Sequence, residues 1–562
     1  MCAQWLSTTC FTRAVSVCIT WVRCSDTSAL NINSALLYLD NKNSLVDNTN
    51  RINDNAVVNL RQGYLEFRGR EQAFSFENLG TVNLVGGNSF LYSVIGGSGD
   101  NTATLRLGNL VRNVGGGTVN FSTGTTNQVV ITQLNGVAAT AASVLTNGTL
   151  GGWAVHGTNG SGASHFASYS DTLGVGALGS AGFPAYDNAT SDATTLVAPA
   201  ATANININTA GANIPVANDL TINSLRFGDQ TTMQVNIATG KTLTVTSGGI
   251  LFAGTGTNSH YMSGGSVTTP NPELFLYSAG GGWQVFRSAI VGSGLKFVKS
   301  GNGPIFMETG IHTYDGGTLV NQGWLGVNAS SRIPLATDVT KGLIINGGQV
   351  ETYGAGIIAA GNEVTLNGPA QLRYFGDNTV AKLTINNDGS TSTAVIRTFA
   401  ANQGNGNGAR GILTIGAGGL YATSSNVTTT SYIEGRVDFG ATANFVNVAA
   451  PLELVSFSSA PISKEAVRCE AQVRHDGKVL TLTGEGNGPI SALVHALESK
   501  GWANFSLKDY RSHALTAGSE SSAAAYVSLQ SKDGRTVWGC GVDANIELAG
   551  LKALVSAANR LG

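Results

Sequence analysis

The chain has 562 residues, of which 74 are glycine and 12% are charged, and its formal net charge is −2. This near-neutral balance provides no basic field for nucleic acid or for an acidic membrane surface. The length allows several domains and a large buried core, and no apolar run reaches the roughly 18 residues that a membrane-spanning helix needs.

Residues 1–26 contain four of the six cysteines, at Cys2, Cys10, Cys18 and Cys24. Arg13 and Arg23 interrupt this segment, and its first five residues lack the basic start that a secretory signal requires. The cysteine spacing fits no tetrahedral zinc pattern, and a disulfide framework is not confined to one end of a chain. We therefore expect an irregular N-terminal segment without a metal, either a poor signal or a misassigned start.

Residues 27–444 consist of short alternating stretches separated by Gly, Asn, Asp, Ser and Thr. Ala56–Leu60, Thr242–Val245 and Ile412–Ile415 are typical, since each has one apolar face. Such strands cannot form a core singly, but stacking them coil upon coil buries a continuous one. We predict a mostly β chain built on a right-handed parallel β-helix, a solenoid, with no TIM barrel.

Two stretches within this region are more specific, Gly294–Gly303 and His312–Leu325. They resemble the autotransporter-associated β-strand repeat, whose unit contains K-x-G-x-G followed by Y-x-G-G-T. Gly151–Ala154 and Asn223–Phe227 are similar to segments that accompany this repeat. The resemblance implies a parallel β-helix of the secreted, cell-surface kind.

The solenoid region carries no recognisable catalytic or cofactor motif. Gly406–Gly411 satisfies G-x-G-x-x-G, but no strand and helix flank it, and a glycine-rich chain produces the pattern by chance. Carboxylates are too scattered for the paired acids of polysaccharide hydrolysis. His156 and His165 lie in a Gly/Ser-rich stretch, where we expect them to be solvated rather than catalytic. We predict no catalytic residues, no cofactor and no metal.

Residues 445–562 have a different sequence pattern, which predicts two successive β-β-α units. In the first, Val467–Arg474 alternates, Asp476-Gly477 turns the chain and Lys478–Thr483 returns. In the second, Ala523–Ser531 and Arg535–Val542 flank the turn Asp533-Gly534, and a helix follows that Asp543 is placed to cap. We predict a small α+β domain here.

A glycine loop opens the first helix of this segment. The loop is Gly486-Asn487-Gly488-Pro489, and apolar residues then recur at 490, 493, 494 and 497, the stripe of an amphipathic helix. The free N–H groups of a first helical turn and the positive end of the helix dipole attract a small anion such as a carboxylate.

Several motifs in register carry a resemblance to a known family: Gly484–Ile490, Val494–Leu497, Asp509–Leu515, Ala525–Val527, Gly541–Asp543 and Leu551–Arg560. Residues 445–562 resemble the C-terminal regulatory domain of 2-isopropylmalate synthase, the enzyme that opens leucine biosynthesis. The resemblance implies a homodimeric domain that binds leucine as its effector. It implies as ligand-binding residues Gly486, Asn487, Gly488, Pro489, Ile490, Ser491, Leu507, Tyr510, Ala514 and Ile546.

A free amino acid needs donors for its carboxylate, an acceptor for its ammonium group and a dry slot for its side chain. Ser521-Ser522 replaces the acidic–Ala pair that is usual in the family. The sequence therefore leaves the ammonium acceptor unassigned.

The catalytic half of such a synthase is a barrel with an H-x-H pair and an aspartate that hold a divalent metal. The seven histidines of this chain include no two separated by a single residue. We therefore expect that this polypeptide alone does not condense acetyl-CoA with a 2-oxo acid.

Two hypotheses and one non-biological reading remain open. The first is a leucine-sensing regulatory and dimerisation module on an unrelated scaffold, which places the protein in the cytoplasm. The second is a secreted or surface β-helix protein, structural or adhesive, with an adventitious C-terminal domain. The third is that two unrelated reading frames are joined near residue 445.

Overall fold

The computed structural model describes the strands at 9–11 and 16–19 and the ranges 28–42, 46–157, 163–187, 196, 199–228, 231–253, 256–387, 395–398, 411–424, 431–434, 436–438, 450–515, 521–532 and 534–561. The chain divides into two compact units. One comprises Met1–Thr414 with Tyr421–Asp438, and the other comprises Ile415–Leu420 with Phe439–Gly562. The predicted G-x-G-x-x-G stretch at 406–411 lies outside the described residues, apart from Gly411.

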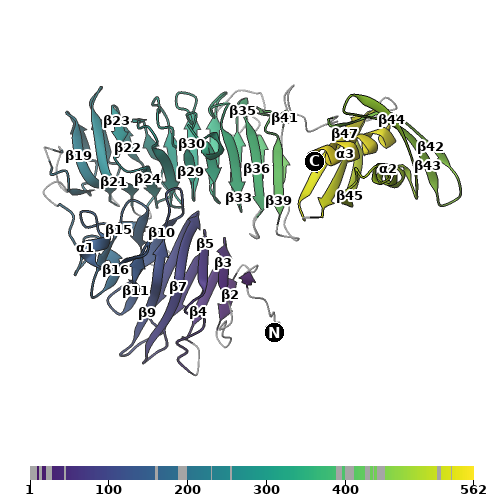
Figure 1. The fold of residues 1–562 in the computed structure, drawn as a ribbon. Coiled ribbons are helices and arrows are strands. Elements are labelled where there is room, and N and C mark those ends of the chain that lie inside the picture. Colours follow the sequence, from purple (N-terminus) through teal and green to yellow (C-terminus); the bar gives the residue numbers. More distant parts are fainter. Residues whose placement is uncertain are drawn as a thin grey trace. The chain divides into compact units, whose positions relative to one another are not determined.

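The first unit is a β-solenoid whose strands pair almost entirely in parallel (Figure 1). Its first stack contains two sheets of alternate strands. One sheet comprises β1 (Thr9–Phe11), β3 (Ala29–Asn33), β5 (Val57–Arg61), β7 (Phe74–Gly86), β9 (Thr102–Val111), β11 (Asn127–Ile131), β12 (Gln133–Leu134) and β13 (Val137–Ala138). The other comprises β2 (Ser16–Ile19), β4 (Leu36–Asp40), β6 (Tyr64–Arg68), β8 (Asn88–Val94), β10 (Thr118–Ser122), β14 (Ala154–Gly157), β15 (Ala163–Ser170) and β16 (Gly174–Ala177).

A second stack of coils follows, again with two long sheets. The first sheet comprises β17 (Asn204–Ile207), β19 (Leu220–Phe227), β21 (Thr242–Phe252), β23 (Ser266–Thr268), β24 (Glu273–Ser278), β26 (Ala289–Ile290), β27 (Lys296–Ser300), β29 (Thr318–Val320), β31 (Leu343–Ile345), β33 (Glu363–Asn367), β36 (Lys382–Asn387) and β39 (Leu420–Ser424). The second comprises β18 (Asn213–Val216), β20 (Gln234–Ile237), β22 (His260–Ser263), β25 (Gln284–Phe286), β28 (Pro304–Met307), β30 (Trp324–Asn328), β32 (Gln349–Tyr353), β34 (Gln371–Tyr374), β37 (Val395–Thr398) and β40 (Tyr432–Glu434). A short third sheet contains β35 (Asn378–Val380), β38 (Ile412–Ile415) and β41 (Arg436–Asp438).

These findings confirm the predicted solenoid and refine it in two respects. The stacking is interrupted, because β14, β15 and β16 pair antiparallel and end the first stack. In the segment expected to be irregular, β1 and β2 pair in parallel with β3 and β4, so they extend the same two sheets. Helix is scarce among the described residues of this unit, with α1 (Ala141–Val144) and a 3-10 turn at Val339–Lys341.

Asparagine side chains align from coil to coil and satisfy one another inside the solenoid. Asn346 Nδ2 donates to Asn321 Oδ1 at 3.0 Å, across 25 residues of chain. Asn367 Nδ2 donates to Asn346 Oδ1 at 2.7 Å, 21 residues on, and Asn386 Nδ2 donates to Asn367 Oδ1 at 2.8 Å, 19 residues on. Because each amide has both a donor and an acceptor, an identical residue on every coil forms a continuous ladder. The ladder links four successive coils, although their lengths differ.

The K-x-G-x-G pattern has a physical role at Lys299, whose side chain is fully buried. Its ammonium Nζ donates to three backbone carbonyls, Gly301 O at 2.5 Å, Gly303 O at 2.6 Å and Gln322 O at 2.7 Å. Burial holds the pKa of Lys299 well below its usual range. The lysine thus donates to carbonyls of two successive coils.

His156 and His165 are placed differently from the solvated loop we expected. They lie on β14 and β15 and face each other as a pair in the antiparallel register. Burial lowers the pKa of each to about 4, and His156 Nε2 lies 2.9 Å from Thr123 Oγ1. The stretch around them thus contains two paired strands, which composition alone does not distinguish from a loop.

The second unit is an α+β domain in which each half has three strands and one helix. The first half contains β42 (Leu452–Pro461), β43 (Val467–His475), β44 (Lys478–Gly486) and α2 (Pro489–Glu498). The second half contains β45 (Phe505–Ala514), β46 (Ala523–Ser531), β47 (Thr536–Asp543) and α3 (Ile546–Leu561). Both sheets are antiparallel, and the predicted order of strands and helices is confirmed with one extra strand in each half. The predicted turn residue Asp533 lies outside the described residues.

Glycines on the last strand of each half let a helix approach closely. A Cβ on Gly484 would lie 2.2 Å from Ala492 O of α2, and a Cβ on Gly541 would lie 2.0 Å from Ala549 O of α3. Gly486 and Gly539 are similarly crowded by the same two helices. Alanines on the facing helix surfaces complete this packing, and the two halves share one hydrophobic core.

The asparagine ladder generates a first prediction. Asn346→Ala removes one donor and one acceptor from the buried ladder, leaving Asn321 and Asn367 without those bonds. Each unsatisfied buried group costs about 1–3 kcal/mol, so we expect the denaturant midpoint of the solenoid to fall clearly. Asn302→Ala, at an exposed asparagine, is the matched control. An Asn346→Ala midpoint equal to that of the control would contradict the ladder's role.

The close helix approach generates a second prediction. Gly541→Ala forces α3 away from β47, and such overpacking costs about 1–3 kcal/mol. Gly488→Ala is a matched control for stability, because Gly488 has an extended backbone and open space around it. Thermal unfolding followed by circular dichroism should show a lower transition for Gly541→Ala only. Equal transitions would mean that the helix accommodates the methyl group at no cost.

Candidate functional site

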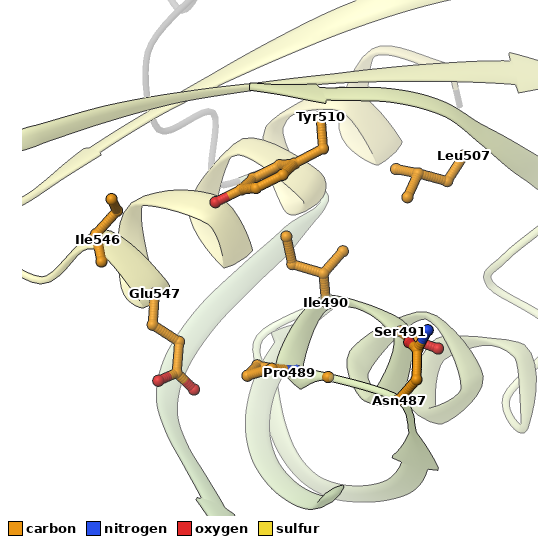
Figure 2. A pocket seen from close by; sticks show the side chains of 9 residues that line it. Asn487, Pro489, Ile490, Ser491, Leu507, Tyr510, Ile546 and Glu547 are labelled. Atoms are coloured by element: carbon orange, nitrogen blue, oxygen red, sulfur yellow. The ribbon is translucent and has the colours of Figure 1, made fainter. Parts of the chain in front are cut away.

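A cavity of about 480 Å³ lies in the second unit where α2 begins, beside β45 and the start of α3 (Figure 2). Its size is within the range of about 300–1,000 Å³ that is typical of small-molecule sites. The lining residues are Asn487, Gly488, Pro489, Ile490, Ser491, Leu507, Tyr510, Ile546 and Glu547.

The start of α2 provides the cavity's hydrogen-bond donors. Gly488 is the residue before the helix, with φ −171° and ψ 175°, and it makes no side-chain capping bond. Pro489 occupies the first turn, and the Gly488 carbonyl already accepts from Ala492 N at 2.9 Å. The amide groups of Ile490 and Ser491 belong to the orphan donors of the first turn. Together with the helix dipole they make this end of the cavity attractive to an anion.

The walls of the cavity are apolar and partly open to solvent. Leu507 and Tyr510 on β45 are 43% and 38% exposed, and Ile546 at the start of α3 is 54% exposed. Figure 2 shows the ring of Tyr510, from β45, and the side chain of Ile490, from α2, pointing toward one another. The Tyr510 hydroxyl lies close to Gly550 of α3, since a Cβ added to that glycine would be 3.1 Å from the hydroxyl oxygen. Large exposed apolar side chains around a cavity indicate a binding surface.

The start of α3 supplies a carboxylate. Asn545, and not the predicted Asp543, caps this helix, since Asn545 Oδ1 accepts from Glu547 N at 2.8 Å and from Leu548 N at 3.4 Å. Asp543 instead accepts from Asn545 N and pairs with Lys552 at 2.7 Å. Glu547 lines the cavity, and its Oε1 accepts a hydrogen bond from Ser459 Oγ of β42 at 3.0 Å.

Most residues that the sequence nominated lie together, although whether they bind a ligand stays a prediction. Asn487, Gly488, Pro489, Ile490, Ser491, Leu507, Tyr510 and Ile546 line the cavity. Gly486 and Ala514 do not: Gly486 packs beneath α2, and Ala514 ends β45 on the exposed surface. Sequence reasoning missed Glu547, because an acidic residue in a first helical turn is ordinarily explained by the helix dipole.

The described residues contain no group of three His, Cys, Asp or Glu that could hold a metal ion. Cys469 and Cys540 are both buried and free. Within the described ranges, no helix combines the length and the apolar character that crossing a bilayer requires.

Comparison with known proteins locates a match in the same unit. Residues 443–562 match the LeuA allosteric (dimerisation) domain. The 2-isopropylmalate synthase of Corynebacterium glutamicum (strain R) is 39% identical over 118 residues, which cover 21% of this chain and 19% of that protein. Those of Mycobacterium ulcerans (strain Agy99) and Kineococcus radiotolerans are 47% and 48% identical over 91 residues, covering 16% of each chain.

The chain therefore matches only about a fifth or less of the length of these curated relatives. The β-solenoid lies outside the matched segment. The similarity to the LeuA allosteric (dimerisation) domain family and to 2-isopropylmalate synthases thus lies in residues 443–562.

Proposed function

We propose that the C-terminal unit is a leucine-sensing regulatory and dimerisation module of the 2-isopropylmalate synthase type, joined to a β-solenoid. The observation that carries this proposal is the apolar cavity at the uncapped start of α2, inside the segment that matches the LeuA domain. Leucine's carboxylate would accept from the first-turn amides of α2. Its isobutyl group would lie against Ile490, Leu507 and Tyr510, where about 25 cal/mol is gained per Å² of apolar surface removed from water.

This module is regulatory rather than catalytic. The described residues of the first unit form stacked parallel coils, not a barrel, and no two histidines of the chain are separated by a single residue. We propose that synthesis of 2-isopropylmalate is not an activity of this polypeptide alone.

A second candidate function is that of a secreted or surface structural protein whose C-terminal unit is adventitious. An aromatic row favours it: Phe306 of β28 lies 5.5 Å from Tyr353 of β32, and Tyr353 stacks at 4.9 Å on Phe375, which directly follows β34. Trp283 and Trp324 extend the row, with ring centroids 4.4 Å apart. Fractionation of producing cells distinguishes the two functions, since export favours the structural protein and retention in the cytoplasm favours the leucine sensor.

Leucine binding is the third prediction. Calorimetric titration of the full chain with L-leucine should give a saturable isotherm. Leu507→Ala and Ile546→Ala should each weaken binding about tenfold through lost apolar burial. Val479→Ala, at an exposed residue outside the cavity lining, should bind as the unaltered chain does. A flat titration at millimolar leucine would end the proposal.

Dimerisation is the fourth prediction. Light scattering coupled to size exclusion should give twice the 57.7 kDa chain mass, because exposed apolar side chains on the C-terminal unit, such as Val455 and Leu480, gain from being covered by a second copy. A mass of one chain at every concentration up to about 100 μM, far above the dissociation constant of a stable interface, would contradict the dimer.

A further inference from the structure

The two helices that begin at the cavity differ in how their first turns are satisfied. The amides at the start of α3 already bond to the side chain of Asn545, whereas α2 has no side-chain cap. Both helix starts contribute lining residues. The first-turn N–H groups that have no side-chain acceptor therefore belong to α2.

The start of α3 contributes a negatively charged side chain to the cavity. Among the described residues, Glu547 is the acidic side chain that lines the cavity, and it comes from α3. Ser459 donates to its Oε1, which holds the carboxylate in place without neutralising its charge. Within the described part of the chain, no lysine or arginine forms an ion pair with Glu547, whereas nearby Asp543 is paired with Lys552. A carboxylate at the rim of an apolar cavity favours a cationic group of the ligand.

The cavity also has an apolar wall, to which Ile490, Leu507 and Tyr510 contribute. A ligand that suits all three features has an anionic group, a cationic group and a branched apolar side chain on one small framework. We infer that Glu547 binds the ammonium group of the effector, so that the cavity selects free α-amino acids over acids of the same shape without an amine. This inference rests on the proposed function. It assigns to Glu547 the role of ammonium acceptor, which the pair Ser521-Ser522 leaves unassigned.

The charges set the direction in which the ligand lies. Its carboxylate faces the α2 amides and its ammonium group faces the start of α3. A ligand lacking the amine keeps the anionic and apolar contacts but leaves Glu547 beside an uncharged methylene. Charge-assisted hydrogen bonds contribute about 1.5–3 kcal/mol, which corresponds to roughly a tenfold to hundredfold loss of affinity.

The test compares two ligands on three forms of the full chain. L-Leucine and 4-methylpentanoate, which is leucine without its amine, are titrated into the unaltered protein, Glu547→Gln and Glu470→Gln. Glu470 is an exposed carboxylate on β43 that does not line the cavity, so Glu470→Gln controls for the change in net charge. Circular dichroism checks that each variant is folded.

The expected result is that Glu547→Gln weakens leucine at least tenfold, leaves 4-methylpentanoate unchanged within twofold, and abolishes the preference between the two. Glu470→Gln should retain that preference. Leucine binding that is equal in the unaltered protein and Glu547→Gln would overturn this inference and leave the proposed function standing. Absence of leucine binding to the unaltered protein would overturn both.

Discussion

The contact of each C-terminal helix with the strand before it is the constraint on which the candidate site depends. Glycines at 484, 486, 539 and 541 leave no side chain between strand and helix. Because Gly486 ends β44 and α2 begins at Pro489, the helix must start immediately beyond the contact. The same arrangement places the start of α3 just after β47. Both helix starts thus contribute to one cavity, and its polarity follows from which of them carries a side-chain cap.

The two units solve the problem of burying short strands in different ways. The solenoid stacks similar coils, and polar groups in its interior bond to neighbours of the same kind, as in the asparagine ladder, or to a long side chain such as Lys299. The C-terminal unit instead covers each three-stranded sheet with one helix. The first solution yields stacked coils around a continuous core, whereas the second brings two helix starts and strand β45 together around a cavity. That cavity is the physical reason for assigning the ligand to the second unit.

Sequence reasoning succeeded where side chains report their surroundings directly. The period of α2 and the alternation of Val467–Arg474 predicted both elements, because apolar residues there face one core. β45 was not predicted, because most of Phe505–Ala514 is exposed and its apolar residues do not alternate with polar ones. The place of Glu547 in the cavity lining was not predicted either, because it depends on how β45 packs beside two helix starts. The partial burial of His156 and His165 depended likewise on the pairing of β14 with β15.

Hydrogen–deuterium exchange of the full chain with and without L-leucine tests the central claim most directly, because it locates a ligand without altering any residue. The account predicts slower exchange in three separate segments, the α2 start near 488–494, the part of β45 near 507–511 and the α3 start near 546–550, with no change in the solenoid. Unchanged exchange in these segments at saturating leucine, or protection confined to the solenoid, would contradict it.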